Sequence, residues 1–334
     1  MKNRSAIIIA GPCSVDDNNI KEIREISEIE ITNREGKKHR AIGGTRIVGL
    51  KSRTELDSSG NGMGMDYDAY RKNVEIIMNG GGIKDLEILP SAYIAEEIVN
   101  ETGMIIATEV MNPIIQLPSF EGKVGKGKFI PWNPAVNQLG WHIEQTALFA
   151  KRNGWHIGLK NGKWIGDHLH SADDENYTGK TTMEKTWSGL TRYIQDLDGD
   201  IILIHRGVDV PGKGDFRSAV VHNIARRVKK ETGAKLYFDP SHSYGPKLRS
   251  HIVGAVVEAM RMKTAQDEFL YDGALIETGT STTDTEQHIT IQELRELVSV
   301  LSSFRDLVAP EEGKQKSKKR TKMKEKPNYK YSSH

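Results

Sequence analysis

Four side chains of metal-binding types lie at or near the ends of short apolar runs: Cys13, His242, Glu277 and Asp284. Cys13 is the only cysteine in 334 residues, so it cannot form an internal disulfide. It is therefore a packed side chain, a nucleophile or a metal ligand. A thiol, an imidazole and two carboxylates together suit a borderline divalent transition metal such as Mn, Fe, Co or Zn. Taken alone, each residue is also compatible with an ordinary packed or loop position. The site therefore depends on a fold that gathers all four.

A second group of residues is cationic and also lies at the ends of apolar runs: Arg46, Lys51, Arg53, Lys160 and Arg206. Cations at the ends of buried strands must find anions. Some of them can pair with Glu109, Asp239 and Glu277. The cations outnumber those partners, and Arg binds phosphate or carboxylate through two parallel hydrogen bonds. The group therefore favours a highly phosphorylated small-molecule substrate.

These residues are positioned by eight near-continuous apolar runs, which predict parallel strands covered on both faces. The runs are residues 6–10, 45–50, 104–108, 128–132, 156–160, 200–205, 235–239 and 274–277. Helical spacing lies between them, at 67–79, 92–102, 141–153, 182–196, 218–232, 247–262 and 289–307. Eight strand–helix repeats predict an α/β fold, a (β/α)8 TIM barrel, in preference to a doubly wound open sheet. In such a barrel the chemistry lies at the carboxyl ends of the strands, where these ionisable residues occur.

Composition indicates a soluble globular protein, and 334 residues suffice for one large α/β barrel or two ordinary domains. Hydrophobic residues make up 37% of the chain and charged residues 28%. No apolar run approaches the ~20 residues of a membrane span. A single cysteine is typical of a reducing compartment, so we expect a cytoplasmic protein with no membrane association. We expect residues 1–310 to form a single catalytic barrel and residues 311–334 to form a disordered tail.

The predicted tail is strongly basic. From Lys314 onward it has nine Lys or Arg residues and one Glu, a net charge of +8, which leaves −6 for the rest of a chain whose total is +2. With almost no aliphatic residues it cannot bury enough surface to fold alone. It is either a solubilising tail or a non-specific contact for nucleic acid or another polyanion. Nothing in the barrel sequence indicates nucleic-acid recognition.

Short motifs in a fixed order connect these residues to a known family. They are IAGPCS, LKSRT, ATEV, LKNG, HRG, DPSHSYG, and IETG followed by TDTEQ, between residue 6 and about residue 305. In this order they resemble the metal-dependent 3-deoxy-D-arabino-heptulosonate-7-phosphate (DAHP) synthases. The wider superfamily includes the 3-deoxy-D-manno-octulosonate-8-phosphate synthases and the sialic acid synthases. The resemblance implies a (β/α)8 barrel transferase that condenses phosphoenolpyruvate with erythrose 4-phosphate and releases phosphate, at the first step of the shikimate pathway.

The resemblance also implies roles for individual residues. Metal binding falls to Cys13, His242, Glu277 and Asp284, so Cys13 and His242 act in catalysis as ligands of a divalent transition metal. Lys51 lies between the two substrates and is our candidate proton donor to the developing alkoxide. Substrate binding falls to Arg46, Lys160 and Arg206 for phosphoenolpyruvate, to Arg53 and Thr54 for the phosphate of the aldose, and to Lys51, Glu109 and Asp239 within the pocket. Proteins of this family usually assemble, so we expect a homo-oligomer.

Two departures from the family pattern leave the aldehyde open. The usual Lys-Pro-Arg-Thr is here Lys-Ser-Arg-Thr. After the fourth strand the family offers an arginine to the phosphate of phosphoenolpyruvate, whereas this chain has IPWNPAVNQ, with Asn133 and Asn137 and no arginine. Asparagine in this region is more similar to the sialic acid synthases, and the Lys-x-Arg-Thr motif favours the heptulosonate branch. The alternatives are a related synthase for an octulosonate or sialic acid type of product, or a catalytically silent relative.

Overall fold

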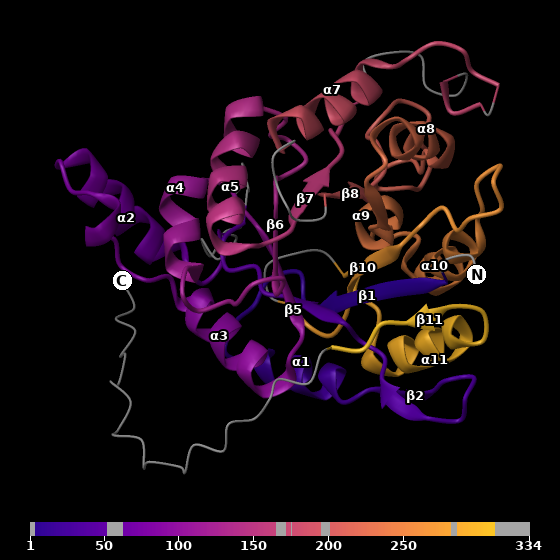
Figure 1. The fold of residues 1–334 in the computed structure, drawn as a ribbon, viewed down its shortest axis with the longest axis horizontal. Coiled ribbons are helices and arrows are strands. Elements are labelled where there is room, and N and C mark those ends of the chain that lie inside the picture. Colours follow the sequence, from indigo (N-terminus) through magenta and orange to yellow (C-terminus); the bar gives the residue numbers. More distant parts are fainter. Residues whose placement is uncertain are drawn as a thin grey trace.

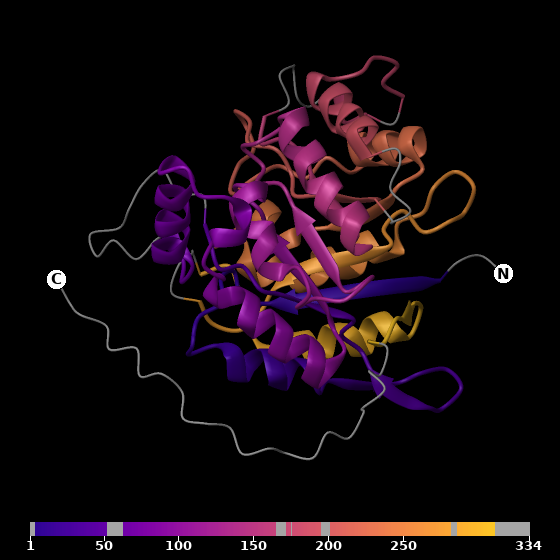
Figure 2. The same cartoon turned by 60° about the vertical axis from the view of Figure 1, so that its left-hand side comes forward.

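The computed structural model describes residues 4–51, 63–164, 172–174, 176–194, 201–281 and 286–310. These residues form a closed barrel of eight parallel strands surrounded by helices (Figures 1 and 2). The barrel strands are β1 (Ser5–Gly11), β4 (Gly44–Arg46), β5 (Ile105–Glu109), β6 (Phe129–Trp132), β7 (Ile157–Lys160), β8 (Ile201–His205), β9 (Lys235–Phe238) and β10 (Gly273–Glu277). Each of the eight predicted runs overlaps one of these strands, so the predicted (β/α)8 fold is confirmed.

The barrel closes where the first strand pairs with the last. β1 pairs in parallel with β10, from Ile7 opposite Gly273 to Gly11 opposite Glu277. On its other side β1 pairs with β4, and the remaining strands follow in chain order around the barrel. Figure 1 shows β1 beside β10, although they come from opposite ends of the chain. Closure therefore brings the segment after β1 next to the segment after β10.

Both faces of the strands are buried, which is why their sequences are nearly continuous apolar runs. In β1, Ile8 and Ala10 belong to the core shared with the surrounding helices, whereas Ile9 belongs to a separate cluster. That cluster also contains residues from β5, β6, β8, β9 and β10, so it fills the barrel interior. Alternate residues of one strand therefore pack into two different cores.

The helices follow the predicted segments with shifts of a few residues at their ends. The α-helices are α1 (Ile20–Ser27), α2 (Tyr67–Met78), α3 (Pro90–Thr102), α4 (Pro113–Gln116), α5 (Gly140–Asn153), α7 (Thr182–Leu190), α8 (His222–Thr232), α9 (Pro240–Tyr244), α10 (Ile252–Arg261) and α11 (Ile291–Ser302). The sequence did not predict α1, α4 or α9. It also missed the hairpin of β2 (Glu30–Thr32) and β3 (Lys38–Arg40), and β11 (Asp306–Leu307), which pairs with the start of β1. Within the described segments, no helix has the length and apolar character needed to cross a membrane.

Candidate active site

The carboxyl ends of the strands gather most of the predicted site residues. Arg46, Glu109, Lys160 and Glu277 are the last residues of β4, β5, β7 and β10. The other described members follow a strand closely: Cys13 after β1, Lys51 after β4, Arg206 after β8, and Asp239 and His242 after β9. Parallel strands place all these ends at one mouth of the barrel. The remaining three predicted residues, Arg53, Thr54 and Asp284, lie outside the described residues.

Arg46 and Glu277 form a buried ion pair across the mouth. The Nη2 atom of Arg46 lies 3.0 Å from Oε1 of Glu277, and the side chains are 1% and 0% exposed. Burial opposes the charge on Arg46, but the negative groups around it, Glu277 foremost, raise its pKa above the ordinary value. Arg46 is therefore a fixed positive charge.

Lys160, Asp239 and His242 form a second buried network. The Nζ atom of Lys160 lies 3.4 Å from Oδ2 of Asp239, and Nδ1 of His242 lies 3.0 Å from Oδ1 of the same carboxylate. Burial works against ionisation of Asp239, but His242 and Lys160 hold its pKa well below the usual range. Burial lowers the pKa of His242 and outweighs the opposing effect of Asp239, so the imidazole is neutral at pH 7 with its proton on Nδ1.

Lys51 with Cys13, and Glu109, also belong to the described part of the site. Nζ of Lys51 donates a hydrogen bond of 2.9 Å to Sγ of Cys13, and both side chains are buried. Glu109 is half-buried at the end of β5. Burial opposes its ionisation, but Lys160 and Lys51 lead the groups that lower its pKa. Buried positive and negative groups therefore lie together at the mouth.

Several buried hydrogen-bond donors of this mouth have no partner among the described residues. They are Nε and Nη1 of Arg46, Nε and Nη1 of Arg206, and Nε1 of Trp132. Burial lowers the pKa of Arg206 to about 10, so it stays charged at neutral pH. A buried donor without an acceptor is costly, and buried groups are almost always paired. The unpaired donors therefore point to an anionic ligand.

His242 has the arrangement expected of a metal-binding histidine. Its Nδ1–H is directed at a carboxylate, which leaves Nε2 as the basic nitrogen, 3.7 Å from Oε1 of Glu277. Cys13 follows β1, the strand that pairs with the strand of Glu277. The types of donor fit a transition metal. Within the described segments, no group of three or more His, Cys, Asp and Glu side chains is arranged to hold a metal ion. The fourth predicted ligand, Asp284, lies outside these segments.

The structure adds two residues to the site that the sequence did not single out. Nε2 of Gln287 donates to Oε2 of Glu277 at 2.5 Å, and Nε2 of His288 accepts a hydrogen bond of 3.0 Å from the backbone N–H of Cys13. Gln287 belongs to the TDTEQ motif, and this was the one sequence feature that could have indicated either residue as part of the site. Both residues support predicted metal ligands.

Asn133, in the segment that lacks the expected arginine, is fully engaged with the backbone. Its Oδ1 accepts from the N–H of Lys160 at 2.9 Å, and its Nδ2 donates to the carbonyls of Lys160 and Asn137. The side chain therefore ties the end of β6 to the end of β7. Its bonds position Lys160 and leave no donor to replace an arginine.

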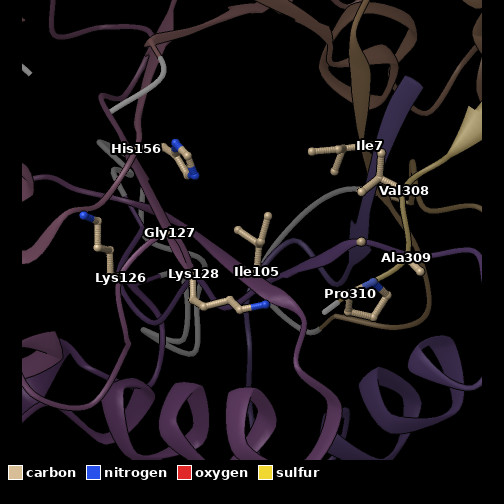
Figure 3. Close-up of a pocket in the computed structure, with 10 residues that line it drawn as sticks. Ile7, Ile105, Lys126, Gly127, Lys128, His156, Val308, Ala309 and Pro310 are labelled. Carbon is tan, nitrogen blue, oxygen red and sulfur yellow. The ribbon is translucent and has the colours of Figure 1, made fainter. Parts of the chain in front are cut away.

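A cavity of about 340 Å³ lies at the opposite end of the barrel. Its lining includes residues at or near the amino ends of barrel strands, among them Ile7, Ile105 and His156, which face one another in Figure 3, and the segment 308–310 that follows β11. Catalytic groups of TIM barrels lie at the carboxyl ends of the strands. This cavity therefore does not belong to the site.

Comparisons with known proteins agree with the fold. No family model matches the sequence, and no curated protein matches it. A crystal structure of phospho-2-dehydro-3-deoxyheptonate aldolase (DAHP synthase) from Thermotoga maritima is similar, with a TM-score of 0.62 at 18% identity over 90% of this chain and 69% of that chain. A truncated form of 3-deoxy-D-arabino-heptulosonate 7-phosphate synthase from the same organism gives 0.59 at 17% identity, over 90% of this chain and 87% of that chain. At these identities the likeness establishes the barrel fold alone.

Proposed function

We propose that this chain is a transferase that condenses phosphoenolpyruvate with erythrose 4-phosphate and releases phosphate, a DAHP synthase. One observation carries the proposal: buried arginines at the barrel mouth keep guanidinium nitrogens without a partner among the described residues. Nη2 of Arg46 pairs with Glu277, whereas its Nε and Nη1 have no partner in the described part of the chain. Nε and Nη1 of Arg206 have none there either. Such donors fit the several oxygens of a phosphorylated carboxylic acid.

In this proposal the cations at the strand ends hold phosphoenolpyruvate. Arg46, Lys160 and Arg206 would bind its carboxylate and phosphate from three different strands. Burial keeps their charges effective because the surrounding dielectric is low. Binding two mutually repelling phosphorylated substrates side by side is the main task of such a site. Arg53 and Thr54 would bind the phosphate of the aldose, as the resemblance implies.

Lys51 is the proposed proton donor. Its ammonium group donates a hydrogen bond to Sγ of Cys13, a predicted metal ligand. The carbonyl oxygen of the aldehyde would develop negative charge beside that ligand. Asp239 would keep the proton of His242 on Nδ1. Cys13, His242, Glu277 and Asp284 would hold a divalent transition metal. When bound, that metal supplies Lewis acidity toward the carbonyl oxygen.

The choice of erythrose 4-phosphate rests on the Lys-x-Arg-Thr motif. The asparagines after β6, which are similar to those of the sialic acid synthases, do not favour the amino-sugar branch, because Asn133 is occupied by backbone groups. Oδ1 of Asn137 likewise accepts from the backbone N–H of Leu139. The heptulosonate reaction is therefore our first choice.

The test is phosphate release by metal-reconstituted protein supplied with phosphoenolpyruvate and one of three aldehydes. These are erythrose 4-phosphate, a longer sugar phosphate and an amino sugar. We expect turnover with erythrose 4-phosphate. Turnover with only one of the other aldehydes would assign the chain to another branch of the superfamily. No phosphate release with any aldehyde would refute the enzyme and favour a binding protein.

Two matched variants test whether the unpaired nitrogens of the buried arginines bind substrate. Arg206→Lys keeps the charge but removes the planar fork, so we expect kcat/KM for phosphoenolpyruvate to fall roughly 10-fold or more. Arg305→Lys is the control, because Arg305 is also buried but donates to the carbonyls of Ser5 and Tyr271 at the other end of the barrel. It should alter stability and leave kcat/KM for phosphoenolpyruvate unchanged.

A third variant tests the proposed metal ligands. Cys13→Ala should lose bound metal, measured by elemental analysis, while its circular dichroism spectrum stays the same as that of the unmodified protein.

A further inference from the structure

Trp132 is the last residue of β6 and lies on the inner wall of the barrel. It pairs with Glu109 of β5 on one side and Gly158 of β7 on the other. Its side chain is 1% exposed and packs in the interior cluster. It is therefore a large aromatic group at the point where the strands end and the charged mouth begins.

Two of the cations proposed to bind substrate lie over its ring. The guanidinium carbon of Arg46 is 5.6 Å from the ring centroid and Nζ of Lys160 is 5.2 Å from it. Tryptophan offers the most favourable face for such cation–π contacts. Trp132 therefore lies within the first layer of groups around any anion that Arg46 and Lys160 bind together.

The indole N–H of Trp132 is buried and has no acceptor among the described residues. The other two fully buried tryptophans are different. Nε1 of Trp155 donates to the carbonyl of Val124 at 3.0 Å, and Nε1 of Trp187 donates to that of Leu159 at 2.8 Å. Buried indoles usually find an acceptor in this way. Trp132 is the exception, and Arg46, whose guanidinium carbon lies 5.6 Å from the centroid of its ring, also has unpaired nitrogens, so one ligand could satisfy both residues.

We propose that the indole N–H of Trp132 donates a hydrogen bond to the anionic substrate group held by Arg46 and Lys160. Trp132 thereby supplies a donor in the segment where the sequence lacks the arginine expected after this strand. The ligand is a carboxylate or phosphate oxygen of a small phosphorylated acid. This inference rests on the proposed function, because it concerns the same anion site.

A direct test is the indole resonance of Trp132 in the full-length protein labelled with 15N at its tryptophans. The chain has five tryptophans, and Trp132→Phe identifies the relevant signal. Phosphoenolpyruvate, inorganic phosphate and pyruvate are titrated separately. We expect the Trp132 proton to move downfield with phosphoenolpyruvate, while the Trp155 signal stays in place. A matching shift with phosphate alone assigns the contact to phosphate, and one with pyruvate alone assigns it to carboxylate.

Three variants separate the N–H from the ring. Trp132→Phe keeps an aromatic face and removes the donor, whereas Trp132→Leu removes both. We expect calorimetry to show phosphoenolpyruvate binding weakened roughly 10- to 100-fold in both, the effect of one hydrogen bond to a charged group. Trp155→Phe removes a paired indole N–H elsewhere and should bind as the unmodified protein does. It controls for general loss of packing.

The outcomes distinguish this inference from the proposed function. A shifted indole signal and weaker binding by Trp132→Phe, without turnover of any aldehyde, support the inference and refute the proposed reaction. Turnover with an unmoved indole signal at saturation refutes the inference and keeps the reaction. Unchanged binding by Trp132→Phe together with weak binding by Trp132→Leu also refutes it, because the ring face alone would then matter. No saturable binding of any of the three anions overturns both.

Discussion

Asp66 carries a buried carboxyl group, and its change to asparagine tests how burial affects the ionisation of this group. The residue lies just before α2. In the described part of the chain its carboxylate accepts hydrogen bonds from the N–H of Ser91 at 2.9 Å and from the Oγ of Ser91 at 2.5 Å. Its backbone N–H donates to the carbonyl of Gly49, two residues before Lys51. Asp66 therefore fastens the segment that leads to the proposed proton donor against the start of α3.

The cost of ionising Asp66 follows from its pKa. Burial raises that pKa from 3.8 to about 6, against the opposing hydrogen bonds from Ser91. The folded state thus binds the proton more tightly than the unfolded state. The stability gained from the protonated group is full below pH 3.8 and is lost as the pH rises through about 6. A difference of about two pKa units corresponds to roughly 3 kcal/mol at pH 8.

Asp66→Asn cannot ionise, so it escapes this loss. We expect the free energy of unfolding of the variant, minus that of the unmodified protein, to rise by about 2.4 kcal/mol from pH 4 to pH 8. Urea unfolding followed by circular dichroism at each pH measures this difference. Asp68→Asn, at an exposed aspartate, controls for loss of one negative charge. A difference for Asp66→Asn that stays flat across this range would refute the reasoning.

Two further substitutions test packing and buried polar contacts. Tyr271→Phe removes the hydroxyl that lies 2.7 Å from Nδ1 of both His205 and His222, so urea unfolding at pH 7 should show a loss of about 2 kcal/mol. Gly158→Ala would place a Cβ 2.8 Å from the Cβ of Trp132 inside the barrel, and the urea midpoint should fall by the equivalent of about 1–3 kcal/mol. An unchanged midpoint in either variant would contradict the packing described.

The strands were predictable because a strand buried on both faces needs apolar side chains at nearly every position, and this leaves a continuous apolar run in the sequence. β4 shows where that signal ends. The apolar run predicted a strand over 45–50, but β4 ends at Arg46. Beyond Ile47 the backbone bonds go elsewhere, from Val15 to the carbonyl of Val48 and from Asp66 to that of Gly49. Burial continues past the strand, so the apolar pattern continues as well, while the pairing does not.

The ionisable members of the site could also be predicted, because charge at the end of an apolar run is conspicuous. Their supporting partners could not. His288 contacts the backbone of Cys13 across 275 positions, and Trp132 looks like any core aromatic in its own run. The β2–β3 hairpin was missed for a related reason, since only Ile31 of its six strand residues is apolar and packs in the core. Contacts that depend on closure of the barrel leave no local trace in the sequence.

The buried arginines at the mouth of the barrel differ from Arg305, at the other end, in how their nitrogens are paired. All three guanidinium nitrogens of Arg305 donate to backbone carbonyls, so its burial is compensated within the described fold. Arg46 and Arg206 each keep two nitrogens with no acceptor in the same described part, although Arg46 has Glu277 beside it. Packing alone would not maintain this arrangement, because an unpaired buried donor destabilises the fold by about 1–3 kcal/mol. In the proposed function, a bound anion would supply the missing acceptors at these two strand ends and at the indole of Trp132.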